Sequence, residues 1–152
     1  MQMERFTSLA QAALGEAQSI ASSMSHSELL PLHLLAAFVR DKDGVGRVII
    51  ERAGGDLLQL DKVVESELKK LPRVTSEGQM QVPRTGTEMM QALTSAEQES
   101  KRMGDTVISV EHLLVGIADT KSMASEILQT LGINKKHLVT AVEALRESSG
   151  VT

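Results

Sequence analysis

The sequence lacks several residue types that small proteins often use for chemistry or for building β-sheets. Among its 152 residues there is no cysteine, tryptophan or tyrosine, and phenylalanine occurs only at Phe6 and Phe38. Without cysteine there can be no disulfide bond, no thiolate ligand for a metal and no cysteine nucleophile. Because β-sandwiches and barrels draw on aromatic and β-branched residues at alternating positions, an aromatic content of 1% favours a core of packed helices.

Long apolar runs and clusters of positive charge are also missing. No apolar stretch is long enough to cross a bilayer and Met1–Ala10 does not resemble a signal peptide, so we expect a soluble, cytoplasmic protein with no membrane partner. The net charge is −4 and the 16 lysine and arginine residues are scattered along the chain. A nucleic-acid partner is therefore not expected. No Gly-x-x-x-x-Gly-Lys-Ser/Thr stretch is present, so we expect neither ATP hydrolysis nor a nucleotide cofactor.

An internal repeat is the main feature that the sequence does contain. His33 and His112 lie 79 residues apart (112 − 33 = 79), and each is followed by Leu-Leu. Gly54 and Gly132 lie 78 residues apart (132 − 54 = 78), so one residue has been gained or lost between the copies. A composition of 41% hydrophobic and 24% charged residues suits a globular fold, and the length suits one domain made of two small units.

The spacing of apolar residues within each copy predicts helices. In the first helix they recur at steps of three and four, which places Phe6, Leu9 and Ala13 on one inward face. By the same reasoning we expect helices that begin near Pro31 and Val110, and helices over residues 46–52, 56–71, 87–103, 122–131 and 134–147. The predicted fold class is all-α, with eight helices arranged as two pseudo-symmetric four-helix repeats. Repeat one is residues 4–71, the linker 72–83, and repeat two 84–149.

Several segments, taken together, resemble a known family. They are Phe6-Thr7, Pro31-Leu32-His33-Leu34-Leu35, Leu71-Pro72-Arg73-Val74, Arg102-Met103-Gly104-Asp105 and Ser109-Val110-Glu111-His112-Leu113-Leu114. In this order they resemble the double N-terminal repeat of the Clp ATPases along essentially the whole chain. The Leu-Pro-x-Val link followed by Gly78 is more similar to the ClpB-type protein disaggregases than to ClpA or ClpC.

This resemblance implies a function. In such proteins the domain is a mobile, non-catalytic appendage of a hexameric AAA+ ATPase, and it catches unfolded or aggregated polypeptide at a groove between the repeats. The family positions that affect substrate handling correspond to Thr7, Asp105 and Glu111, which we predict to be substrate-binding residues. The isolated domain is expected to be monomeric. Family members often keep apolar side chains along the fifth helix, where this sequence has Thr94, Ser95, Glu97, Gln98 and Glu99.

Other interpretations stay open. The chain could be an adaptor-docking domain of a ClpA- or ClpC-type unfoldase, or a freestanding scaffold of a Clp protease complex. Thr7 could simply cap the first helix. His33 and His112 lack the spacing of metal ligands and suit hydrogen bonds at helix starts, so no metal site is predicted. Asp105 could stabilise the loop after the fifth helix, and Glu111 the first turn of the sixth.

Overall fold

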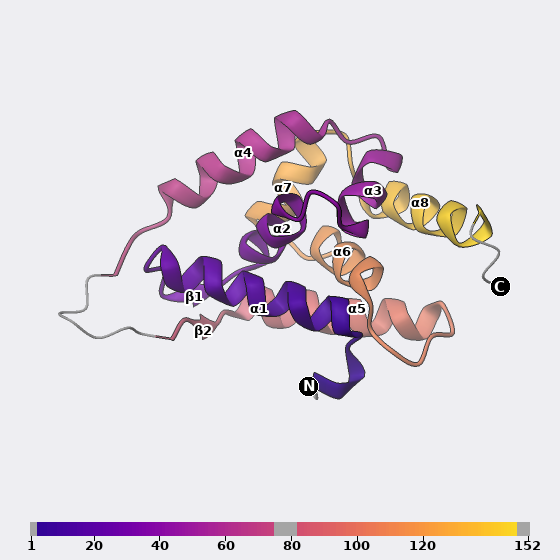
Figure 1. Cartoon of the computed structure of the whole chain (residues 1–152), viewed down its shortest axis with the longest axis horizontal. Helices are drawn as coiled ribbons and strands as arrows, with labels where there is room; N and C mark the ends of the chain where they lie inside the picture. Colours follow the sequence, from indigo (N-terminus) through magenta and orange to yellow (C-terminus); the bar gives the residue numbers. More distant parts are fainter. Residues whose placement is uncertain (1–2, 75–81, 149–152) are drawn as a thin grey trace.

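The computed structural model describes residues 3–74 and 82–148, which contain eight α-helices. The helices are α1 (Ser8–Ser23), α2 (Pro31–Arg40), α3 (Val45–Arg52), α4 (Leu57–Lys70), α5 (Thr87–Arg102), α6 (Val110–Ala118), α7 (Met123–Thr130) and α8 (Lys135–Ser148) (Figure 1). A short 3-10 helix η1 (Met3–Arg5) precedes them, and two strands, β1 (Glu28–Leu29) and β2 (Arg84–Thr85), complete the fold. The predicted all-α fold with eight helices is confirmed. Within the described ranges no helix has both the length and the apolar character needed to cross a membrane.

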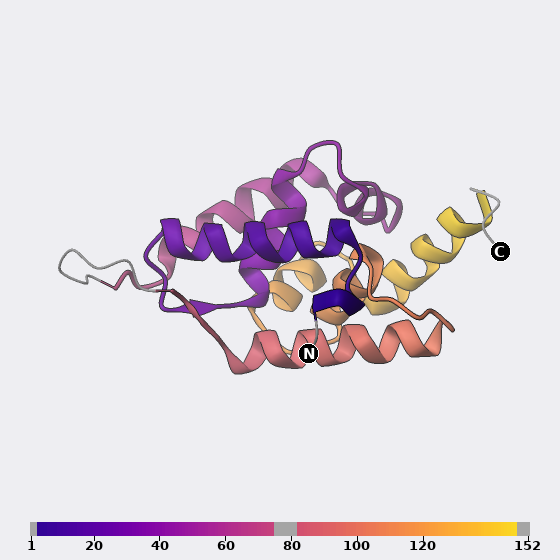
Figure 2. The same ribbon diagram turned by 60° about the horizontal axis from the view of Figure 1, so that its bottom comes forward.

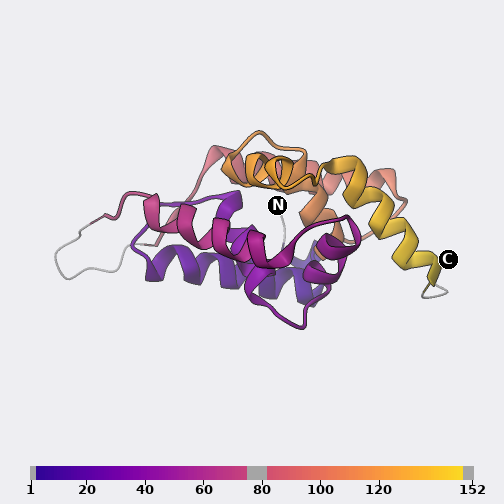
Figure 3. The same cartoon turned by 90° about the horizontal axis from the view of Figure 1, so that it is seen from above.

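The helices form two matching series. Helices α1 to α4 contain 16, 10, 8 and 14 residues, and helices α5 to α8 contain 16, 9, 8 and 14. Figure 3 shows the two series as two layers that lie against each other. The repeat boundaries stay a prediction. Residues 75–81 of the predicted linker and residue 149 of repeat two lie outside the described residues.

The two halves are joined by short backbone pairings that the sequence pattern did not predict. Leu29 pairs with Thr85 in the parallel β1–β2 ladder, and Phe6 forms a separate parallel bridge with Ile108. The two pairings are equivalent, since 85 − 6 = 79 and 108 − 29 = 79. Each repeat therefore contributes two short extended segments, and each of these pairs with a segment of the other repeat. Strands of two residues are too short to show the alternation by which a strand is recognised in a sequence.

Helices α2 and α6 form the centre of one shared core. Every residue of α2 from Pro31 to Val39 is buried, as is most of α6. Helix α2 contacts α1 and α4 of its own repeat and α7 of the other, while α6 contacts α5, α8 and α3. Figure 2 shows α1 and α5 running along the outside of this centre. Because the two repeats pack through their central helices, neither repeat buries its apolar surface alone.

Two details differ from the sequence-based expectation. Helix α1 begins at Ser8, so Phe6 precedes it and reaches the core from the extended segment that pairs with Ile108. Leu9, expected to face inward, is 67% exposed. The predicted glycine stops are confirmed. Gly54 and Gly132 follow α3 and α7 with φ of 100° and 82°, a left-handed conformation that glycine adopts without steric cost.

Candidate functional site

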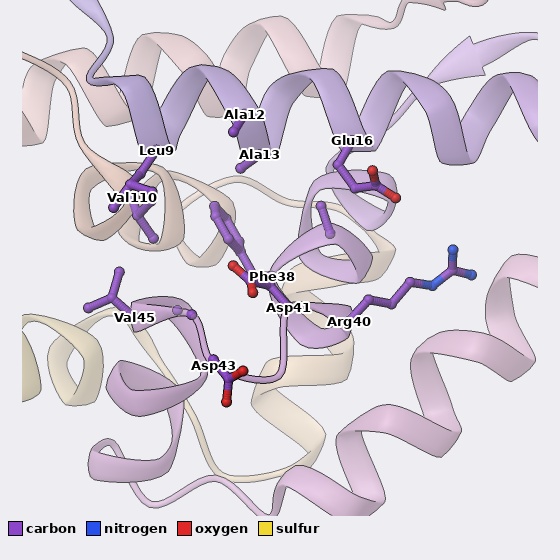
Figure 4. A pocket seen from close by; sticks show the side chains of 13 residues that line it. Leu9, Ala12, Ala13, Glu16, Phe38, Arg40, Asp41, Asp43, Val45 and Val110 are labelled. Carbon is purple, nitrogen blue, oxygen red and sulfur yellow. The ribbon is translucent and has the colours of Figure 1, made fainter.

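A cavity of about 670 Å³ lies between α1, the end of α2, the start of α3 and the first residue of α6 (Figure 4). We call it the junction pocket. Its apolar side chains come from Leu9, Ala12, Ala13, Ala37, Phe38, Val45 and Val110. Val110 belongs to repeat two and the other six belong to repeat one, so the pocket lies at the junction between the repeats. Leu9 is 67% exposed and Val45 is 42% exposed, so this apolar surface is open to a ligand.

The local sequence explains why the pocket forms between α2 and α3. Gly46, in the first turn of α3, packs directly against Phe38 of α2. A Cβ atom at Gly46 would lie 3.1 Å from the Phe38 Cβ, closer than ordinary van der Waals contact. Glycine therefore lets α3 approach the Phe38 ring, and this approach brings Val45 to the edge of the pocket.

Acidic side chains line the rim of the junction pocket. Glu16, Asp41 and Asp43 line it, and none of their carboxylates makes a salt bridge or hydrogen bond to another described residue. Arg40 also lines the pocket, but its Nε and Nη2 donate to the two carboxylate oxygens of Glu65 at 2.8 and 2.9 Å. Figure 4 shows the Arg40 side chain extending away from Leu9, Val45 and Val110.

Next to Val110, repeat two carries a network of charged side chains that we call the acidic cluster (Asp105, Glu111, His112 and Arg146). The Arg146 Nη2 donates to the Asp105 Oδ2 at 2.7 Å and to the Glu111 Oε1 at 2.8 Å. Arg146 comes from α8, so this ion pair ties the last helix to the start of α6. The Arg146 guanidinium, assisted by His112, holds the pKa of Asp105 below its usual value.

The hydrogen bonds of His112 define its tautomer. Its Nδ1 accepts from the backbone N–H of Ser109 at 2.9 Å, so in the neutral ring the proton is on Nε2, which donates to the Asp105 Oδ2 at 2.7 Å. The helix-start hydrogen bond predicted for His112 is confirmed. Ligand atoms of Asp105, Glu111 and His112 lie within 4.8 Å of one another. However, both His112 nitrogens are already used and Arg146 holds the carboxylates, so these contacts build an ion-pair network and do not favour a metal site.

Repeat one carries a neutral version of the same arrangement. The His33 Nδ1 accepts from the Leu30 N–H at 2.9 Å, and the His33 Nε2 faces the His26 Nδ1 at 2.8 Å. Burial, followed by the nearby His26, lowers the pKa of His33 to about 4. At the positions of Glu111 and Arg146 this repeat has Leu32 and Leu68, since 111 − 79 = 32 and 146 − 78 = 68.

The three predicted site residues are not all brought together. Asp105 and Glu111 meet through Arg146, whereas the Thr7 Oγ1 accepts from the Ala10 N–H at 3.2 Å and caps α1. The Thr7 backbone N–H donates to the Ile108 carbonyl at 3.0 Å, in the segment between Asp105 and Glu111. Sequence reasoning missed Arg146 and the exposure of Leu9. One signal for Arg146 exists in the sequence: the repeat alignment pairs it with Leu68, so a charged residue stands where the other copy has an apolar one.

The surface of the fifth helix is polar, as its sequence indicated. A second cavity, of about 440 Å³, lies between α5 and residues 119–121 and is lined by polar side chains such as Thr94 and Gln98. The Ser95 Oγ donates to Asp119 at 3.0 Å. Glu99 is buried and held by Arg102 through two hydrogen bonds of 2.7 Å. The junction pocket is the larger of the two cavities and has more apolar side chains in its lining.

Comparison with known proteins gives the family. Residues 5–145 match the model of the Clp repeat (R) N-terminal domain. The chain belongs to this family. It is 35% identical over 150 residues to the chaperone protein ClpB of Rhodopirellula baltica, and 32% identical over 147 residues to ClpB of Rickettsia felis. These matches cover 99% and 97% of this chain but only 17% of each relative. The resemblance to ClpB-type N-terminal repeats is confirmed.

Solved structures of the Clp family share the fold. The Hsp104 N-terminal domain from Candida albicans superposes with a TM-score of 0.79 at 24% identity, over 97% of this chain and 93% of that one. The N-terminal domain of the ClpV1 ATPase from E. coli superposes with a TM-score of 0.76 at 20% identity, over 95% of this chain and 87% of that one. The region matched is an N-terminal domain of larger Clp ATPases, and the catalytic part of those proteins lies outside it.

Proposed function

We propose that this chain is a non-catalytic recruiting domain that binds apolar segments of unfolded or aggregated polypeptide in the junction pocket. On this proposal it serves a hexameric, ClpB-like ATPase in the cytoplasm. The observation that carries the proposal is the open apolar pocket between the repeats, in which Leu9 and Val45 are exposed. Exposed apolar surface that can receive side chains of an extended peptide is typical of protein interaction sites.

Weak binding suits this role. A pocket of this volume accepts only a few side chains, so each contact with an unfolded chain is of low affinity. Six tethered copies in a hexamer would raise the overall avidity without slowing release from any one copy. The fold is compatible with peptide binding, since one similar structure, with a TM-score of 0.70, is described as a complex of the ClpV N-domain with a VipB peptide.

The three predicted substrate-binding residues would act mainly by holding the pocket walls. Thr7 caps the start of α1, two residues before Leu9. Glu111 directly follows Val110, and its contact with Arg146 holds the start of α6 against α8. The Asp105 and Glu111 side chains are each 25% exposed, so their outer edges can also meet a bound chain. Loss of either contact would move an apolar wall and weaken substrate binding.

The test compares substitutions of two leucines that are both largely exposed, Leu9 at 67% and Leu58 at 73%. Leu9→Glu places a charge in the junction pocket, whereas Leu58→Glu places it on α4, where Leu58 is 73% exposed and lines none of the described cavities. Binding of an unfolded polypeptide, with its cysteines blocked by a neutral reagent, is measured by fluorescence anisotropy. Because burying a leucine contributes about 1.5 to 3 kcal/mol, we expect Leu9→Glu to weaken binding by about tenfold or more and Leu58→Glu to leave it unchanged.

Two outcomes would contradict the proposal. The first is equal binding by the wild type and the Leu9→Glu variant. The second is a failure of unfolded polypeptide to bind while a folded adaptor binds tightly, which would favour the adaptor-docking alternative. Circular dichroism of both variants checks that the helices are intact, as expected for substitutions at exposed positions.

A further inference from the structure

The charges around the junction pocket are unevenly paired. The segment from the end of α2 into α3 contains side chains of both charges: the cations Arg40, Lys42 and Arg47, and the anions Asp41 and Asp43. All three cations form salt bridges with carboxylates of α4. Arg40 binds Glu65, and both Lys42 and Arg47 bind Asp61 at 3.3 and 2.8 Å.

This arrangement leaves the pocket rim negative. Asp41 and Asp43 make no salt bridge within the described residues, and they share the rim with Glu16 of α1. The cations that could have neutralised them are held by α4 carboxylates: Arg40 through two short hydrogen bonds, and Arg47 as a largely buried side chain, 13% exposed. The pocket thus combines an apolar lining with three carboxylates that make no salt bridge within the described residues. Of the three, Glu16 also interacts electrostatically with Arg40, whose salt bridge is to Glu65, so Asp41 and Asp43 carry most of the unbalanced charge.

A ligand that enters this pocket meets both features together. Its apolar side chains replace water against Leu9 and Val45, while its flanking residues come to lie beside the carboxylates. A lysine or arginine there gains an ion pair at each contact, and a glutamate or aspartate is repelled. Each exposed ion pair is weak, but three carboxylates together can discriminate between ligands by about tenfold.

We infer that the junction pocket selects polypeptide segments in which apolar side chains are flanked by lysine or arginine. The inference rests on the proposed function and adds the class of substrate: cationic apolar segments are recruited and anionic ones are rejected. Because the carboxylates are exposed at the rim, the selection acts on the residues next to the buried side chains. It depends on ionic strength, since salt screens exposed charges.

The test uses two short peptides that differ only in charge, Gly-Lys-Leu-Trp-Leu-Lys-Gly and Gly-Glu-Leu-Trp-Leu-Glu-Gly, both with blocked ends. The chain contains no tryptophan or tyrosine, so tryptophan emission reports the peptide alone. We expect the lysine peptide to bind about tenfold more tightly than the glutamate peptide at low salt, and the ratio to shrink as salt is added.

Two triple variants test whether the rim carboxylates cause the preference for the lysine peptide. In the triple variant Glu16→Gln, Asp41→Asn and Asp43→Asn the preference should fall to about twofold or less. The control triple variant Glu51→Gln, Glu126→Gln and Glu147→Gln changes net charge equally at exposed carboxylates outside the described cavities, and the preference should persist. Equal changes in both variants would overturn the inference.

The outcomes separate this inference from the proposed function. If both peptides bind equally well and Leu9→Glu weakens both, charge selection is wrong while recruitment at the pocket stands. If neither peptide binds, charge selection is again wrong, and binding of the unfolded polypeptide decides recruitment independently.

Discussion

The starts of α2 and α6 share one backbone contact but differ in the chemistry behind it. His33 and His112 each accept a hydrogen bond from the backbone N–H three residues earlier. Behind His33 lies a second neutral ring, His26, whereas behind His112 lies Asp105, held by Arg146. The same fold position thus carries a neutral contact in repeat one and an ion pair in repeat two.

This difference distinguishes a contact that both repeats need for folding from contacts that can differ between the repeats. The histidine at the helix start satisfies a backbone donor in both repeats, so it belongs to the scaffold. The carboxylates and Arg146 occur only in repeat two, next to the Val110 wall of the junction pocket. A pseudo-symmetric fold can therefore carry one asymmetric site.

The largest expected effect comes from forcing repeat one to resemble repeat two. Leu68, the counterpart of Arg146, is fully buried. Leu68→Arg would bury a cation opposite Leu32 and the neutral His26, with no carboxylate in the equivalent positions. We expect it to cost about 4 kcal/mol or more in the free energy of unfolding, measured by urea denaturation at pH 7.

The reverse substitution is the matched control. Arg146→Leu removes a side chain that is 29% exposed and leaves Asp105 and Glu111 in partial contact with water. It should cost only about 1 to 2 kcal/mol. Equal costs for Leu68→Arg and Arg146→Leu would show that the two sites do not differ in burial and charge as described.

The second effect concerns pH. The pKa of His33 falls from 6.5 to about 4 on folding, so the folded state binds fewer protons than the unfolded chain between these values. The contribution of His33 to the free energy of unfolding is then fully present above pH 6.5. It is lost as the pH falls toward 4, by up to about 3 kcal/mol. Asp105, whose pKa is lowered from 3.8, contributes a loss only below that pH.

The variant that checks this effect is His33→Gln. A glutamine at the third helical position can still accept from the Leu30 N–H but does not titrate. Urea unfolding from pH 7 to 4 should therefore show a flatter profile for His33→Gln than for the wild type. Parallel profiles would mean that titration of this histidine does not govern acid stability.

The smallest effect concerns the start of α1. Thr7 caps α1 through its hydroxyl, whereas its counterpart Gly86 precedes α5 without a side-chain cap. Thr7→Ala should lower the free energy of unfolding by about 1 kcal/mol, and Thr7→Ser should restore most of it. Thermal unfolding measures both. If Thr7→Ala weakens peptide binding but leaves stability intact, the hydroxyl contacts the ligand directly and the capping explanation is insufficient.

Much of the fold could be predicted from the sequence because its signals are local. The spacing of apolar residues predicted the helices, and the 79-residue offset predicted that they form two copies. Gly54 and Gly132 predicted where α3 and α7 end. Leu9 was misplaced because the helix starts only at Ser8, which puts this residue at the open end of the apolar stripe. A single helical period cannot tell where a neighbouring helix stops covering it.

The candidate site was predicted less completely, because it depends on tertiary contacts. Asp105 and Glu111 lie close together along the chain, but Arg146 joins them from α8 and leaves no local pattern. Whether the rim carboxylates form salt bridges depends on which carboxylates the neighbouring cations bind in the folded chain. Asp43 and Lys42 are adjacent in the sequence, yet only Lys42 is paired, with Asp61 of α4.

The most direct measurement is amide shift mapping by NMR, with the chain titrated with an unfolded polypeptide. The account predicts saturable shifts that gather around Leu9, Ala13, Val45 and Val110, weaker ones at Thr7, Asp105 and Glu111, and their disappearance in the Leu9→Glu variant. Saturable shifts confined to the polar surface around Thr94 and Ser95, and unchanged by Leu9→Glu, would contradict it.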